Sequence, residues 1–144
     1  MIAAGGQDAA ARTRLESTVK LFPKEQAPRQ ILARLLAASP EAEVRDGWRA
    51  FELGRDLFAE SHSMASAVTL AMAYAELGDF DQATAFQQAA IDTALQYGQL
   101  GPVLGLQAQL KEYQDQKPCR RPWSKDDPLY QSSSYAVDPD VGGS

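Results

Sequence analysis

The residues of this chain that could do chemistry are few and far apart. His62 is the only histidine, and it has a serine on each side and no cysteine near it. A nucleophile, a base and a group that orients the base would all have to be built around this one imidazole. We therefore expect His62 to be a turn residue and predict that the chain is not an enzyme.

Metal and cofactor sites are not indicated either. Cys119 is the only cysteine, so an intramolecular disulfide and a zinc site of paired cysteines are excluded. A free thiol is expected there, although a bridge to another chain stays open. Asp79 and Asp81 could suggest a metal, but helix capping and the helix dipole explain both carboxylates. Asp56 and Glu60 are expected on a solvated helix face. We predict no metal and no cofactor, since the sequence also has no Gly-rich phosphate loop or His-containing metal motif.

Charge argues against nucleic acid as a partner. The net charge is −5, and residues 41–116 carry four Lys/Arg against twelve Asp/Glu. Residues 1–40 are more basic, with six Lys/Arg against three Asp/Glu. A nucleic-acid surface needs clustered Lys and Arg to neutralise phosphates. The central part of the chain has the opposite sign, so we predict no nucleic-acid binding.

No segment has the composition of a membrane span. A spanning helix needs about 20 consecutive apolar residues, and no stretch of the sequence approaches that length. Residues 1–6 lack the basic start and the apolar run of an intact signal peptide. We predict no transmembrane segment and a cytoplasmic location, with a periplasmic location as the alternative if a signal peptide has been removed.

The elements that must position any site are predicted to be helices only. Alanine is common and Val and Ile are sparse, a composition that favours helix over strand. Apolar residues recur at helical spacing over residues 7–22, 26–38, 44–59, 64–77, 80–97 and 103–114. The helix over 64–77 is apolar or small on almost every side, so neighbours are expected to bury it on more than one face.

Capping signals mark several of these boundaries. Ser39-Pro40-Glu41 has the hydroxyl, the proline and the acid that typically start a helix. Asp46-Gly47 is a local break, so the third helix is expected to begin near Asp46. Gly78 suits a left-handed helix C-cap. Asp79 is predicted to cap the next helix, with Gln82 completing a capping box.

Residues 64–97 resemble one tetratricopeptide repeat, a helix-turn-helix unit of about 34 residues. Three parts of the family pattern are matched. They are a large apolar residue, a small residue and a tyrosine in the first helix, the turn between the two helices, and small residues in the second helix. The matching residues are Leu70, Ala71 and Tyr74, then Gly78-Asp79-Phe80-Asp81, then Ala83 and Ala90. The segment departs from the pattern at Leu95, where the family usually has proline, and at Ala67, where it often has tryptophan.

The resemblance extends over about residues 30–121. An earlier, degenerate unit is matched within residues 30–60 by Leu32, Leu36, Ala50 and Leu57. The stretch Lys117-Pro118-Cys119-Arg120 resembles the ending that follows the last helix in terminal tetratricopeptide units of bacterial proteins. The resemblance implies an all-α fold in which helical hairpins form a short solenoid. We divide the chain into an N-terminal helical segment (1–29), the repeat-like domain (30–116) and an extended Pro/Ser/Gly-containing tail (117–144).

In this family, ligand peptides lie along the first helices of the repeats. Carried over, this marks one mostly apolar set of positions on the helix over 64–77: Val68, Thr69, Met72, Ala75 and Glu76. The alternative is that these residues pack against a neighbouring helix. Three aromatic residues of the tail form a second candidate contact, because aromatic side chains are favoured anchors at interfaces. They are Trp123, Tyr130 and Tyr135.

The resemblance and the lack of a catalytic constellation together predict a non-catalytic interaction module. We expect an adaptor, scaffold or accessory subunit that binds another protein or a multi-subunit complex. The alternative is a C-terminal regulatory repeat region of a larger, enzymatic polypeptide.

Overall fold

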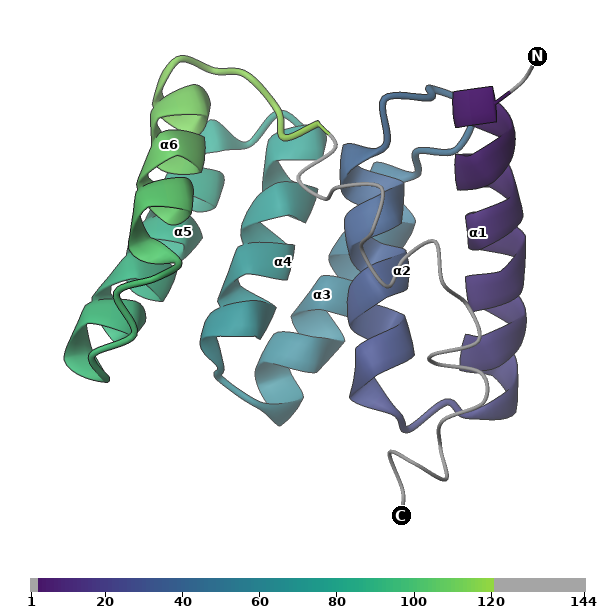
Figure 1. The fold of residues 1–144 in the computed structure, drawn as a ribbon, viewed down its shortest axis with the longest axis horizontal. Helices are drawn as coiled ribbons and strands as arrows, with labels where there is room; N and C mark the ends of the chain where they lie inside the picture. Colours follow the sequence, from purple (N-terminus) through teal and green to yellow (C-terminus); the bar gives the residue numbers. More distant parts are fainter. Residues whose placement is uncertain (1–2, 121–144) are drawn as a thin grey trace.

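The computed structural model describes residues 3–120, with side chains from residue 7 onward. The regular elements of this part of the chain are all helices, with no strand, which confirms the prediction of an all-α protein. Figure 1 shows the helices side by side, with α1 at one end of the row and α5 and α6 at the other. The helices are α1 (Ala3–Leu21), α2 (Gln26–Ala38), α3 (Gly47–Glu60), α4 (Met64–Glu76), α5 (Phe80–Gln96) and α6 (Val103–Gln114).

The helix boundaries follow local signals closely. The predicted ranges 26–38 and 103–114 are those of α2 and α6, the predicted starts of α4 and α5 are also correct, and the remaining boundaries shift by one to four residues. The predicted break at Asp46-Gly47 is confirmed, because α3 begins at Gly47 and the Asp46 carboxylate accepts from the Arg49 N–H at 3.1 Å.

The turn between α4 and α5 has the predicted C-cap and N-cap, but the predicted capping box with Gln82 does not form. Gly78 has a φ of +86°, the left-handed conformation that glycine adopts without strain. Its N–H donates to Ala75 O, and the next N–H donates to Tyr74 O, which completes a Schellman motif. Asp79 caps α5 through the Gln82 N–H at 3.1 Å. The Asp79 N–H is bonded to Tyr74 O at 2.9 Å, so the backbone and not a Gln82 side chain satisfies it.

The helix start predicted at Ser39-Pro40-Glu41 is wrong. Ser39 instead follows the end of α2, and its N–H donates to Leu35 O. Its buried hydroxyl donates to the Asp8 carboxylate of α1 at 2.6 Å while accepting from the Glu41 N–H. A contact with another helix thus determines the role of this hydroxyl, and residues 40–46 form turns that lead to α3.

The core lies around α4, which packs against α2, α3 and α5. Most of its side chains are buried, which confirms that neighbours cover more than one face of this helix. Gly54 allows α3 and α4 to pack closely, since a Cβ there would lie only 3.3 Å from the Leu70 Cα. Within residues 3–120, no helix is long and apolar enough to cross a membrane.

Candidate functional site

The predicted contact residues of α4 are mostly interior. Val68, Thr69, Met72 and Ala75 are all buried, at 9% exposure or less. The structure thus places them against neighbouring helices, which is the alternative that the sequence left open. They do not form an exposed surface in the described part of the chain.

The contacts of Thr69 show how α2 covers this side of α4. Its hydroxyl accepts from Arg34 Nε at 2.8 Å and also lies within hydrogen-bonding distance of Gln30 Oε1. Gln30 Nε2 in turn donates to Ser66 Oγ at 3.1 Å, and Arg34 Nη2 donates to Ala65 O at 2.9 Å. Side chains of α2 therefore form hydrogen bonds with the polar groups of α4, and these bonds fix how the two helices pack against each other.

Glu76, the last of the predicted α4 residues, is held between two arginines. Its Oε2 lies 3.1 Å from Arg45 Nε, and its Oε1 lies 2.9 Å from Arg120 Nη1. Arg45 Nη1 also donates to Ser39 O at 2.8 Å. The carboxylate therefore joins the end of α4 to the loop before α3 and to the segment after α6.

The segment after α6 returns to the helices. We call residues 117–120 the strap; Figure 1 shows it leading from α6 towards α4. The predicted tail begins at residue 117, but its first four residues pack on the domain, with Cys119 only 1% exposed. Burial raises the pKa of the Cys119 thiol to about 12, so the thiol is neutral and unreactive while the strap is closed.

The buried neighbour of Cys119 is Tyr113 of α6. Tyr113 is 1% exposed, and burial is the main cause that raises the pKa of its phenol. Its hydroxyl makes no hydrogen bond of ordinary geometry to the described residues. The thiol beside it is a weak hydrogen-bonding group, so the strap leaves a buried hydroxyl poorly satisfied.

An apolar surface lies at the turn between α5 and α6. Four large hydrophobic side chains within ten residues of sequence are each 50% to 79% exposed. We call this the apolar end surface: Leu95, Tyr97, Leu100 and Leu104. In α6 itself only Tyr113 is fully buried. Leu104 of this terminal helix is thus uncovered within the described chain, whereas Leu106 packs against the core.

Partly buried aromatic rings link α3, α4 and α5, with neighbouring centroids 4.5 to 5.6 Å apart. The row ends at exposed Trp48 on one side and exposed His62 on the other. His62 lies in the short connection between α3 and α4, with its ring edge-on to Phe58. In order, the rings belong to Trp48, Phe51, Tyr74, Phe86, Phe58 and His62.

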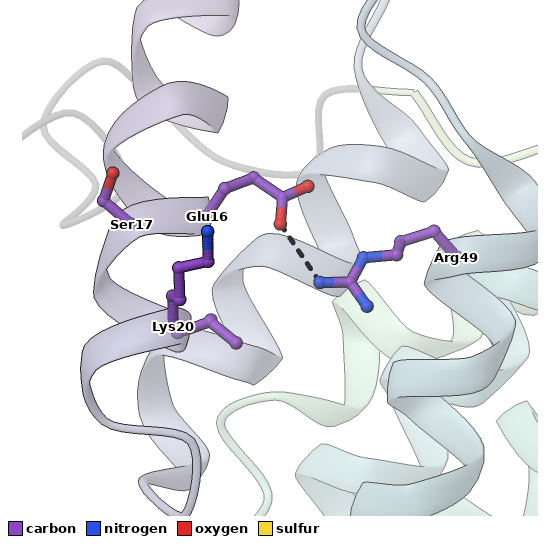
Figure 2. Close-up of a pocket in the computed structure, with 5 residues that line it drawn as sticks. Glu16, Ser17, Lys20 and Arg49 are labelled. Atoms are coloured by element: carbon purple, nitrogen blue, oxygen red, sulfur yellow. Dashed lines mark hydrogen bonds and ion pairs between the residues drawn. The ribbon is translucent and has the colours of Figure 1, made fainter.

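A shallow hollow of about 310 Å³ lies between α1 and α3 (Figure 2). Its charged lining is largely paired, because Glu16 Oε1 accepts from Arg49 Nη2 at 3.0 Å. The other labelled side chains, Ser17 and Lys20, come from α1 and are exposed. No buried polar group points to a ligand there, so we assign the hollow no function.

The other carboxylates serve the fold. Glu60 is not simply solvated, because its two oxygens accept from Arg29 Nη1 and Nη2, each at 2.7 Å. The hydrogen bond to Arg29 lowers the pKa of Glu60. Asp79 caps α5. Among the described residues, no group of three or more His, Cys, Asp or Glu side chains could hold a metal ion.

The sequence did not predict that the strap packs on the helices, nor the Arg45–Glu76–Arg120 cluster or the Arg29–Glu60 pair. All three join residues at least 31 positions apart, and no local signal marks them. The predicted contact residues Trp123, Tyr130 and Tyr135 lie outside the described residues. A comparison of the chain with known protein families, with curated proteins and with solved structures found no match.

Proposed function

We propose that this chain is a non-catalytic, tetratricopeptide-like module that binds another protein as an adaptor or accessory subunit. The observation that carries the proposal is the apolar end surface. Large exposed apolar patches on a folded protein mark interaction sites, because burial of that surface against a partner is favourable. Here four large apolar side chains at half or more exposure lie within ten residues of sequence around one turn.

The position of this surface supports the same proposal. Helical repeats bury their apolar faces by stacking on a neighbour, and a terminal repeat needs a polar outer face to remain soluble. Here the last described helix presents Leu104 at 79% exposure. A partner that packs on α6 and on the α5–α6 turn would supply the missing cover. The helical pairs α2–α3 and α4–α5, together with the close approach at Gly54, support the repeat-like arrangement.

The test uses the full chain and a matched control. Leu104→Ser with Tyr97→Ser removes the apolar end surface, whereas Leu21→Ser changes a leucine of similar exposure (72%) at the α1 end of the row in Figure 1. Partners of the native chain are cross-linked in cells of the source organism and identified by mass spectrometry. We expect the double variant to lose a partner that the Leu21→Ser chain keeps. If both variants retain every partner at equal yield, the apolar end surface is not the binding site.

The aromatic residues of the tail are a second proposed contact. A chain in which Trp123, Tyr130 and Tyr135 are all replaced by serine tests them separately, since this variant leaves residues 3–120 unchanged. Loss of the partner from this chain alone assigns the binding to the tail. Retention of the partner removes the three aromatic residues from the proposed site.

A further inference from the structure

The strap is held by side chains and not by the backbone. Within the described chain, Lys117 N–H still donates to Glu112 O of the helix end, but residues 118–120 make no backbone-to-backbone hydrogen bond. What fixes them is the buried Cys119 side chain and the ion pair of Arg120 with Glu76. Arg120 Nη1 also reaches Ala37 O, at a long 3.5 Å.

Each of these contacts is individually weak. The Arg120 side chain is 33% exposed and that of Glu76 is 18% exposed, so solvent screens the ion pair. A cysteine side chain is small and buries little apolar area. A segment with few buried contacts and no backbone pairing belongs to the regions of a protein that open locally. The strap can therefore leave its place while the six helices stay packed.

Opening leaves a formed site behind. Glu76 keeps its second arginine, Arg45, which holds the carboxylate in position for another guanidinium. The space of the Cys119 side chain stays lined by Tyr113, whose hydroxyl is buried and poorly satisfied even when the strap is closed. A carboxylate held in position, together with the space beside a buried hydroxyl that Cys119 vacates, suits an extended peptide with a small side chain followed by arginine.

We propose that the strap occupies, in cis, a peptide-binding site of this protein. The ligand in trans is an extended segment of another protein in which a small apolar or weakly polar residue is followed by arginine. This site is separate from the apolar end surface and does not depend on it.

The first measurement is the reaction of the chain with an aromatic disulfide reagent. Cys119 is the only cysteine, so its reaction reports the strap alone. We expect the native full-length chain to react at least about ten-fold more slowly than the unfolded chain, because a buried thiol reacts only on opening. Arg120→Ala should speed the native reaction about three- to five-fold, in line with the loss of a partly exposed ion pair. Lys117→Ala removes the same charge at an exposed neighbour and should leave the rate unchanged.

The second measurement tests the site in trans. The probe is a fluorescent peptide with the sequence of residues 115–122 and alanine in place of the cysteine, followed by fluorescence anisotropy. The native strap competes at a high effective concentration, so the peptide should bind the full-length Arg120→Ala chain several-fold more tightly than the native chain. Adding Glu76→Gln to that chain, or replacing the first arginine of the peptide by alanine, should abolish binding. Circular dichroism establishes that each variant keeps its helices.

Several results would overturn the inference. A native thiol that reacts as fast as the unfolded one, or an Arg120→Ala rate equal to that of Lys117→Ala, shows that the ion pair does not hold the strap. A peptide that fails to bind the Arg120→Ala chain at millimolar concentration shows that the strap is only a structural clasp. The Leu104→Ser and Tyr97→Ser chain should show an unchanged thiol rate, so failure of the proposed function and failure of this inference are distinguishable.

Discussion

Gly54 of α3 and Gly105 of α6 form a matched pair for measuring how closely α3 and α4 are packed. Both glycines lie inside helices, and replacing a helical glycine by alanine is favourable by up to about 1 kcal/mol on propensity alone. A Cβ at Gly105 meets nothing within 4 Å. A Cβ at Gly54 would lie 3.3 Å from the Leu70 Cα, 3.4 Å from its Cδ1 and 3.6 Å from its N.

The expected signs of the two changes are opposite. Gly105→Ala should raise the free energy of unfolding by about 0.5 kcal/mol, less than the full propensity because the residue lies in the first turn of α6. At Gly54 the closest atom belongs to the backbone of a packed helix, which cannot move without moving the helix. Overpacking of this kind costs about 1–3 kcal/mol. When the gain in helix propensity is subtracted from this cost, Gly54→Ala should lower the free energy of unfolding by about 1 kcal/mol.

The assay is urea unfolding followed by far-ultraviolet circular dichroism, with native, Gly54→Ala and Gly105→Ala chains measured at equal concentration. The slopes of the transitions should agree, so that differences in midpoint report stability. If Gly54→Ala is as stable as Gly105→Ala, or more stable, then α3 and α4 are not packed at the distance that the structure gives.

Three further predictions concern substitutions of single residues. The Arg29 hydrogen bond lowers the pKa of Glu60 from its usual 4.5, so the stabilisation exists above that pH and is lost as the pH falls through the lowered value. Glu60→Gln should thus lower the free energy of unfolding by about 1 kcal/mol or less at pH 7, because the Glu60 side chain is 44% exposed, and this cost should shrink as the pH falls below 4.5. Urea titrations across that range measure the cost, and a cost that stays constant into acid would contradict the reasoning. Gln116 has a φ of 63° at the end of α6, a left-handed conformation that glycine adopts with less strain. Gln116→Gly should therefore raise the urea midpoint by the equivalent of about 0.5–1 kcal/mol, and a lower midpoint would argue against a left-handed residue there. Leu36→Ala should cost about 2–5 kcal/mol at a fully buried site, and Leu104→Ala close to nothing at 79% exposure; equal costs in calorimetry would refute the placement of these two leucines.

The sequence was sufficient for the helices and most of their ends, because the signals for both are local. Periodicity over residues 26–38 and 103–114 predicts α2 and α6 to the residue. Gly78 and Asp79 shape the turn after α4 through bonds to residues at most five positions away. Such local signals mislead where a residue distant in sequence forms a hydrogen bond with the same side chain. Ser39 has the capping hydroxyl of a helix start, but Asp8 lies 31 residues away in sequence and uses it.

The candidate site was less accessible to sequence reasoning. That α4 is apolar on almost every side indicates burial, but a single sequence does not show which neighbour covers Thr69 and Met72. Arg34 of α2 provides part of that cover, at a separation of 35 residues. The burial of Cys119 has no local signal, because the thiol lies in a short segment among polar and proline residues. Its position depends on an ion pair between Arg120 and a residue 44 positions earlier.

The strap also has a consequence for the order in which the molecule forms. The hydrogen bonds between helices described above join residues at most 39 positions apart, whereas Arg120 reaches Ala37 across 83. Contacts that are near in sequence form early, and helical pairs can form during synthesis as soon as both helices have emerged. We therefore expect α2 to α5 to assemble on the nascent chain, while the strap closes only after residue 120 has left the ribosome. A reactive Cys119 thiol would then distinguish a newly made chain from one that has completed its last folding step.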